Sequence, residues 1–145
     1  MPHFNRSLNG LGRCGTLFRA KHLEGTEIGP CDHPYLFYIC HHPGVSQDTL
    51  GRALYVNKSS VTRRIAHLEE AGFLTREVSD ADRRVLLVYP TEKALAALPL
   101  LREVGANWRE CVTAGFSPEE VRTFEALLER AFENAQGAVA GEVKP

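Results

Sequence analysis

Residues 46–91 read SQDTLGRALYVNKSSVTRRIAHLEEAGFLTREVSDADRRVLLVYPT, and this stretch decides the fold. Two short helical patterns lie close together in it, and a hairpin pattern with arginines at its tip follows. The order helix, turn, helix, strand, charged turn, strand is that of a winged helix-turn-helix module. A basic helix and a basic hairpin are the two shapes that fit the grooves of duplex DNA, so the stretch predicts a DNA-binding module.

The two helical patterns have clear beginnings and a clear buried side. Ser46 and Asn57 are residue types that cap helix N-termini, and Gly72 is suited to close the second helix. Three apolar residues recur at i, i+4 and i+7 in the second helix and form its core-facing stripe: Val61, Ile65 and Leu68. The opposite side of this helix is polar and is expected to face DNA.

The hairpin pattern follows directly. Residues 73–76 begin a strand, residues 79–82 supply turn-forming side chains, and residues 85–89 return as a second strand that Pro90 stops. The turn therefore presents its arginines at the tip of a wing.

Helical patterns precede and follow this module. Apolar spacing predicts a helix over about 5–23 and a short buried helix that opens near Cys31-Asp32. After the wing, Thr91 caps a helix that runs to about residue 113 and is expected to kink near Pro99. Ser117 followed by Pro118 starts a last helix, with a tail that frays from Gly137.

These elements predict a mainly α fold with a small β-wing, an α+β arrangement within a single domain of residues 1–145. The winged helix lobe covers about 31–90. The terminal helices, about 5–25 and 91–138, carry more apolar surface than the small lobe can cover. They therefore predict a helical dimerisation region.

The overall charge does not exclude a DNA-binding function. The net charge is −1, but the acidity is concentrated near the C-terminus, where residues 119–142 hold six acidic and two basic residues. Residues 57–64 hold three cations and no anion. No apolar run spans a bilayer and the first residues lack a signal-peptide pattern, so we expect a cytoplasmic protein without membrane contact.

The chain resembles the MarR family of transcriptional regulators. SQDTLGRAL is similar to that family's scaffolding helix, and NKSSVTRRIAHLEEAGFLTR to its recognition helix and first wing strand. DADRRVLLVYPTEK is similar to its wing, with the signature D-x-R at Asp82-Arg83-Arg84. At position 94 this chain has alanine, where many members of the family have glycine. This difference affects only the start of the helix that follows the wing. The segment CDHPYLFYICHH is less typical of the family.

The resemblance implies an obligate homodimer and a pseudo-palindromic operator in double-stranded DNA. It implies recognition helices in adjacent major grooves and wings in the flanking minor grooves. It also implies ligand or redox control through a pocket between the dimer region and the DNA-binding lobe. These implications favour a repressor that a small-molecule, thiol-oxidation or metal signal releases.

Two groups of residues are candidates for DNA contact. On the recognition helix they are Asn57, Lys58, Ser59, Ser60, Thr62, Arg63 and Arg64. Ser59, Ser60, Thr62 and Arg63 suit base edges, and the other three suit the cap and phosphates. The alternative is a solvated polar helix face.

In the wing the candidates are Asp82, Arg83 and Arg84. The Arg84 guanidinium suits a narrow minor groove, Asp82 can hold it in place, and Arg83 suits phosphate or solvent. The alternative is an ordinary solvated turn with an incidental ion pair.

Three further groups bear on regulation, each with a plain structural alternative. Four aromatic residues are candidates for an effector pocket, or belong to the core: Phe18, Tyr35, Tyr38 and Trp108. Cys14 and Cys111 are candidate redox sensors or plain core cysteines. The group Cys31, His33, Cys40 and His42 has the residue types of a zinc site but no closed-site spacing, so we expect neither metal nor cofactor.

Two other function classes compete with DNA binding. One is a winged-helix module used only for protein–protein interaction, against which the cationic helix face and Arg84 argue. The other is an enzyme, such as a cysteine hydrolase that uses Cys40 with a histidine. No nucleophile elbow, phosphate loop or paired-carboxylate pattern supports it, so we expect no enzyme.

Overall fold

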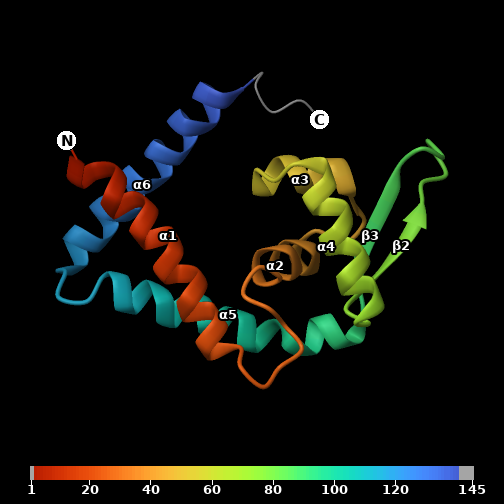
Figure 1. Cartoon of the computed structure of the whole chain (residues 1–145), viewed down its shortest axis with the longest axis horizontal. Helices are drawn as coiled ribbons and strands as arrows, with labels where there is room; N and C mark the ends of the chain where they lie inside the picture. Colours follow the sequence, from red (N-terminus) through yellow and green to blue (C-terminus); the bar gives the residue numbers. More distant parts are fainter. Residues whose placement is uncertain (1, 141–145) are drawn as a thin grey trace.

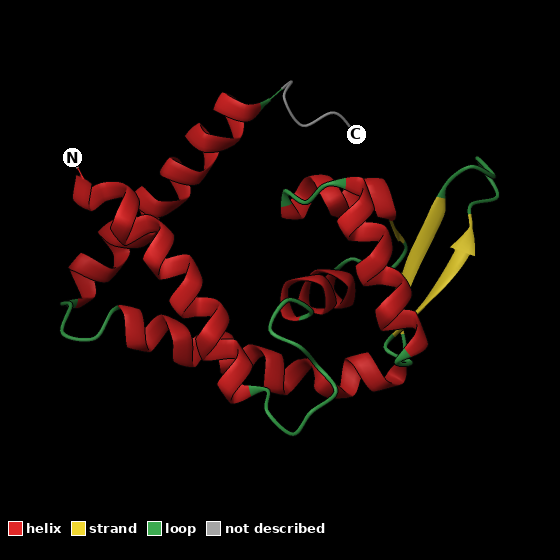
Figure 2. Ribbon diagram, in the orientation of Figure 1, coloured by secondary structure: helices red, strands yellow, loops and turns green. Residues whose placement is uncertain are grey.

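The computed structural model describes residues 2–140, and six helices and three short strands lie in this range (Figures 1 and 2). The helices are α1 (Pro2–His22), α2 (His33–His41), α3 (Gln47–Leu54), α4 (Lys58–Glu70), α5 (Glu92–Val112) and α6 (Pro118–Val139). The strands are β1 (Val45–Ser46), β2 (Leu74–Val78) and β3 (Leu86–Pro90).

The three strands form one antiparallel sheet in the order β1-β3-β2. In the wing hairpin Thr75 lies opposite Tyr89 and Arg76 opposite Val88, while Val45 of β1 pairs with Val88 from the other side. The sequence did not predict β1, because two residues carry no readable alternation. This strand joins the entry of α3 to the wing.

One hydrophobic core joins the lobe to the long helix α5. Its fully buried side chains come from α2, α3, α4, the sheet and α5, among them Leu36, Ile39, Leu50, Ile65, Leu68, Val88 and Leu101. The predicted stripe of α4 is part of this core, since Val61, Ile65 and Leu68 are all buried. The buried side of α4 fixes which side of the helix remains exposed.

The capping residues that the sequence indicated begin their helices. Ser46 Oγ accepts the Thr49 N–H at 3.1 Å, and Asn57 Oδ1 accepts the Ser60 N–H at 2.9 Å. Thr91 caps α5, and Ser117 forms a reciprocal capping box with Glu120 at the start of α6. These predictions are confirmed.

Several predicted boundaries were wrong by a few residues. Both wing strands begin one residue later than expected, at Leu74 and Leu86, and β3 ends with Pro90 instead of before it. Pro90 is accommodated at the end of the ladder, where a missing N–H removes little pairing. The last helix does not fray from Gly137, because α6 continues to Val139.

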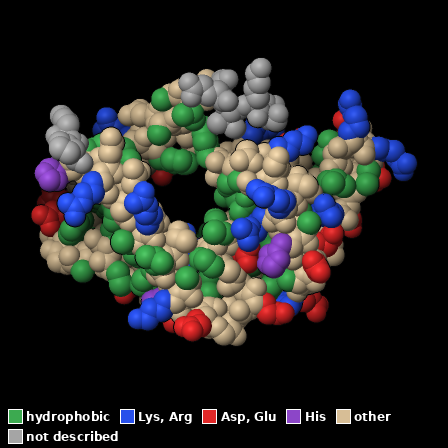
Figure 3. All heavy atoms as spheres, viewed as in Figure 1, with side chains coloured by type: hydrophobic (Ala, Val, Ile, Leu, Met, Phe, Trp, Pro, Cys, Tyr) green, Lys and Arg blue, Asp and Glu red, His purple; other side chains and the backbone are tan. Residues whose placement is uncertain are grey.

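Helices α1, α5 and α6 form an arm that reaches away from the lobe (Figure 1). An open gap separates α6 from the lobe over much of its length, and hydrophobic side chains lie at the edge of the gap (Figure 3). Within residues 2–140, no helix combines the length and the apolar character needed to cross a membrane.

Candidate nucleic-acid interface

The exposed side of α4 is polar and cationic in its first two turns. Lys58, Ser59, Thr62 and Arg63 are exposed, and the first turn contains no acidic residue. The N-terminal end of a helix carries a partial positive charge, which adds to that of Lys58 and Arg63. This end of α4 is therefore suited to an anionic partner.

Short-range hydrogen bonds order these side chains. The Thr62 hydroxyl donates to the Lys58 carbonyl at 2.9 Å, and Arg63 Nη2 donates to Ser60 Oγ at 3.4 Å. The hydroxyl lone pairs of Thr62 and the remaining N–H groups of Arg63 stay available. Lys58, Ser59, Thr62 and Arg63 thus lie together on the exposed part of α4.

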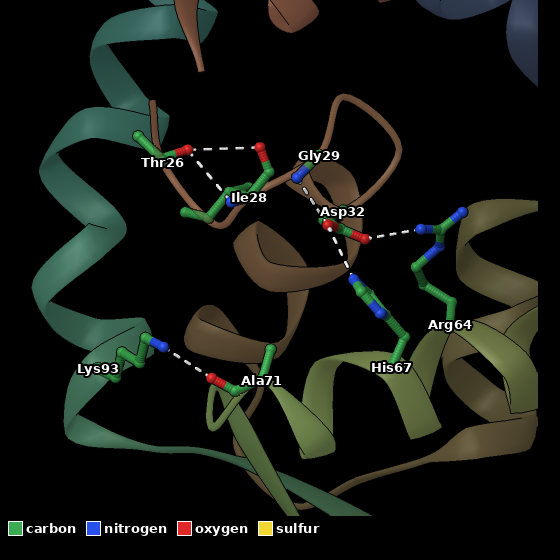
Figure 4. A network of polar contacts seen from close by, with 8 residues as sticks. All are labelled: Thr26, Ile28, Gly29, Asp32, Arg64, His67, Ala71 and Lys93. Atoms are coloured by element: carbon green, nitrogen blue, oxygen red, sulfur yellow. Dashed lines mark hydrogen bonds and ion pairs between the residues drawn. The ribbon is translucent and has the colours of Figure 1, made fainter. Parts of the chain in front are cut away.

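Arg64 has a different environment from its neighbours. Its Nη1 donates to Oδ1 of Asp32 at 2.9 Å, and Asp32 is fully buried (Figure 4). Asp32 Oδ2 also accepts the Gly29 N–H at 2.7 Å, while His67 Nε2 lies 3.9 Å from the same oxygen. The carboxylate therefore ties the loop before α2 to the middle of α4.

The sequence predicts a phosphate contact for Arg64, but the structure gives this side chain an internal partner. A buried carboxylate without a hydrogen-bonded cation would be strongly destabilising, so Asp32 requires Arg64. We therefore remove Arg64 from the candidate DNA-contacting group. Sequence reasoning missed Asp32 because nothing local connects residues 32 positions apart.

At the wing tip, Asp82 and Arg84 pair as the sequence indicates. Arg84 Nε and Nη2 each donate to one Asp82 oxygen at 3.1 Å, and the Arg84 backbone N–H donates to Oδ1 at 3.0 Å. These bonds from Arg84 lower the pKa of Asp82, which keeps it ionised. The Arg84 side chain remains 89% exposed, and Arg83 beside it is exposed as well.

An ion pair joins α4 to the wing hairpin. Arg76 of β2 binds Glu69 of α4 through Nε at 3.2 Å and Nη2 at 2.8 Å. The hydrogen bonds from Arg76 lower the pKa of Glu69. This pair was not predicted from the sequence, although a Glu and an Arg on either side of the closing Gly72 would be a usable signal. It holds α4 and the hairpin in one orientation.

The four aromatic pocket candidates do not converge on one cavity. Phe18 and Trp108 pack on each other where α1 crosses α5, with ring centroids 5.3 Å apart. Tyr35 is buried in the lobe core, and Tyr38 stacks on His42 at 4.1 Å. The plain core interpretation therefore fits Tyr35. The role of the four aromatic residues in an effector pocket stays a prediction.

A different hollow, of about 360 Å³, lies between α2 and α5. Its lining consists of His33, Phe37, Leu101, Arg102, Gly105, Ala106 and Arg109. His33 Nε2 donates to the Leu101 carbonyl at 2.8 Å, since a carbonyl can only accept. Burial lowers the pKa of His33, so its neutral form is favoured there. The hollow has an apolar floor and two arginines.

The cysteine and histidine candidates remain separate. Cys14, Cys31 and Cys111 are exposed, and burial raises the pKa of the partly buried Cys40 thiol. His42 Nδ1 lies 3.0 Å from the Tyr38 carbonyl. Across residues 2–140, no three His, Cys, Asp or Glu side chains come together in a way that would hold a metal ion.

Known proteins share both the sequence pattern and the fold. The sequence model of the MarR family matches residues 28–85. YybA of Bacillus subtilis (strain 168), named as an uncharacterized HTH-type transcriptional regulator, is 33% identical over 102 residues, which cover 70% of this chain and 68% of that protein.

Two solved structures show the likeness in three dimensions. A MarR transcriptional regulator from Methanosarcina mazei Go1 has a TM-score of 0.90 at 26% identity, over 95% of this chain and 99% of that one. A Listeria monocytogenes protein named as a MarR family regulator, solved with a 26mer DNA, has a TM-score of 0.89 at 19% identity, over 98% and 96% of the two chains. The predicted fold class, mainly α with a small β-wing, is confirmed.

The buried carboxylate gives the first testable prediction. Asp32→Asn should lower the free energy of unfolding by about 1–3 kcal/mol, because a charged hydrogen bond to Arg64 is lost in a buried setting. This loss of stability should be smaller than that of breaking a fully buried ion pair, since the Arg64 side chain is 34% exposed. Urea denaturation at neutral pH measures it.

The matched control is Asp82→Asn, which removes the same charge from an exposed arginine pair. It should leave the unfolding midpoint unchanged, because exposed pairs contribute little to stability. Equal midpoints for Asp32→Asn and the unsubstituted protein would show that the buried pair does not hold α4.

Proposed function

The chain belongs to the MarR family of transcriptional regulators, and we propose that it is a homodimeric repressor that binds a pseudo-palindromic operator in double-stranded DNA. The observation that carries this proposal is the joint placement of two exposed cationic elements on one lobe. Lys58 and Arg63 lie at the start of α4, and Arg83 and Arg84 lie at the wing tip. A helix and a hairpin so arranged fit a major groove and the neighbouring minor groove.

The rigidity of the lobe supports this function. The shared core holds α4 on one side, the Asp32–Arg64 bond holds its middle, and the Glu69–Arg76 pair joins it to β2. Reading base edges requires side chains whose backbone does not shift. The Listeria monocytogenes protein of the same fold, solved with a 26mer DNA, is consistent with this use.

The proposed contacts follow from exposure and chemistry. Ser59, Ser60, Thr62 and Arg63 read base edges, while Asn57 and Lys58 hold phosphates at the start of the helix. In the wing, Asp82 orients Arg84 toward the minor groove and Arg83 contacts phosphate. Arg64 stays with Asp32 and holds the helix in place.

The competing classes have less support. The relatives are named as transcriptional regulators, not as enzymes. A pure protein–protein module would need partners that tolerate several exposed arginines and a lysine on one face. A DNA duplex carries a negatively charged phosphate at every nucleotide, which matches these cations.

The dimer is argued from helix α6. This helix has 22 residues and none of them is buried. Leu127, Leu128 and Phe132 are exposed on it, and Phe4 and Leu8 are exposed on α1. A helix without a packed side is marginal in water, so a second copy of this chain is proposed to cover these residues and enter the gap beside α6.

The hollow between α2 and α5 is the proposed effector site. Its floor is apolar, and Arg102 of α5 lines it, while Arg109, two turns further along, is already paired with Glu125. This combination favours a small anion with an apolar body. The geometry gives less support to a metal or thiol signal, because the Cys and His candidates do not gather and burial raises the Cys40 pKa.

DNA binding is tested by titrating the protein with the duplex upstream of its own gene and with a scrambled duplex at two salt concentrations. Specific, salt-sensitive binding is expected. Lys58→Ala should weaken binding to both duplexes and reduce the salt slope by about 0.9, the value of one phosphate contact. Arg63→Ala should lose about 1–3 kcal/mol of discrimination between them.

Arg122→Ala on α6 removes an equal charge away from α4 and the wing, and should bind as the unsubstituted protein does. Binding of neither duplex by a folded protein would contradict the proposed function. Unchanged discrimination in Arg63→Ala would remove that residue from base recognition.

The dimer is tested by sedimentation at micromolar concentration. The unsubstituted chain should sediment with twice its own mass, and Leu128→Glu should shift it toward the monomer, because a charge would be buried in an apolar interface. Glu129→Gln, one residue further along α6, is the matched control and should remain dimeric. A monomeric unsubstituted protein would contradict the dimer.

The effector hollow is tested with benzoate and benzyl alcohol, an anion and a neutral molecule of similar shape. Benzoate should shift NMR signals of His33 and Phe37, with millimolar affinity that weakens in Arg102→Gln, because the guanidinium supplies the charge. Equal binding of both probes would show that the arginines do not select an anion.

A further inference from the structure

Tyr55 has an unusual backbone conformation. It lies at the end of α3, in the turn that leads to α4, with φ 55° and ψ 46°. Among residues 2–140 it is the only non-glycine residue with positive φ. Glycine or asparagine usually fills such a position, because a side chain is disfavoured there. Tyrosine is therefore disfavoured by the backbone conformation of this turn, which suggests that contacts of its side chain compensate the cost.

The Tyr55 side chain reaches helix α6. Its ring meets the Phe132 ring edge-on, with centroids 6.0 Å apart and an interplanar angle of 69°. Its hydroxyl donates a long hydrogen bond of 3.4 Å to the Gln136 carbonyl. Phe132 and Gln136 are four residues apart, so both lie on the same side of α6.

The hydroxyl meets a carbonyl at the end of a helix. Because α6 ends at Val139, Gln136 belongs to its last four residues, whose carbonyls find no regular partner within the helix. The last turn of α6 contains no basic side chain that would compensate this end. Tyr55 thus supplies a donor from a different part of the fold.

Helix α6 is consequently held at both of its ends. Near its start, Glu125 pairs with Arg109 of α5, and Phe124 packs edge-on against Phe116 at 5.7 Å. Near its other end it meets Tyr55. The helix runs from the end of α5 back toward α3 along one side of the open gap (Figures 1 and 3).

We propose that Tyr55 is a positioning residue that docks the end of α6 on the helix-turn-helix turn. Tyr55 lies two residues before Asn57, the N-cap of α4, so the contact fixes the recognition helix relative to the dimer helices. This role rests on the proposed DNA binding by α4. In a dimer, the distance between two recognition helices must match the spacing of the half-sites. Docking at Tyr55 narrows that distance to one value.

Hydrogen exchange of the full-length protein tests the docking without DNA. Tyr55→Gly removes the side chain and suits the positive φ, so the turn itself should not unfold. Amides of residues 137–140 should exchange about two- to tenfold faster, the change expected from losing one hydrogen bond, while α4 amides stay unchanged. Tyr55→Phe keeps the ring but loses the hydroxyl, so its exchange rates should lie between those of the unsubstituted protein and those of Tyr55→Gly. Unchanged exchange in α6 of Tyr55→Gly would overturn the proposal.

Binding to two duplexes tests the consequence for spacing. One is the duplex upstream of the protein's own gene, and the other is the same duplex with one base pair inserted between the half-sites of its pseudo-palindrome. Tyr55→Gly should reduce the preference for the first duplex by about two- to tenfold, with an unchanged salt slope. An equal loss of affinity for both duplexes, with the preference unchanged, would make Tyr55 a direct DNA contact and overturn its positioning role.

The two failures are distinguishable. If the unsubstituted protein binds neither duplex, the proposed DNA binding is wrong and the assignment of Tyr55 to half-site spacing falls with it. The exchange of residues 137–140 then still decides whether Tyr55 docks α6. If the unsubstituted protein binds and Tyr55→Gly discriminates equally well, only the positioning role is overturned.

Discussion

The buried carboxylate of Asp32 is the interaction on which the placement of α4 depends. A carboxylate withdrawn from water must be paired and hydrogen-bonded, and the Gly29 N–H and Arg64 guanidinium meet this demand from two directions. Apolar packing alone would allow α4 to slide or rotate slightly within the core. The directional bond to Arg64 removes this freedom, because a rotation of the helix would separate the carboxylate from its only hydrogen-bonded cation among the described residues.

The side chains of α4 fall into three groups with different surroundings. The buried stripe packs in the core, Arg64 and Glu69 form ion pairs with other elements, and Lys58 and Arg63 remain exposed. Counting cations along the helix therefore overstates the number available to a partner. The overall charge of −1 is equally uninformative, because what matters to DNA is which charges lack an internal partner and lie on one surface.

Local signals made much of the fold predictable from the sequence. Ser46 and Asn57 cap helices, and the wing strands are rich in β-forming residues bounded by turn residues. These signals act within a few residues, so they can be read from the sequence. The Asp32–Arg64 bond joins residues 32 positions apart, and the contact of Tyr55 with Gln136 joins residues 81 apart. Neither leaves a local trace. The sequence also could not assign the aromatic residues, because a tyrosine in the core and a tyrosine that lines a pocket are the same residue type. Tyr35 is an example.

The start of α2 connects both parts of the molecule through adjacent residues. Asp32 binds α4 of the lobe, while the next residue, His33, donates to the Leu101 carbonyl of α5. The lobe and the long helix therefore cannot shift against each other without breaking one of these bonds. Helix α5 leads into α6, and α6 contacts Tyr55 in the turn before α4. Helices α2, α5, α6 and α4 are therefore linked in a closed ring of contacts. We therefore expect a change at any of these contacts to alter the orientation of α4.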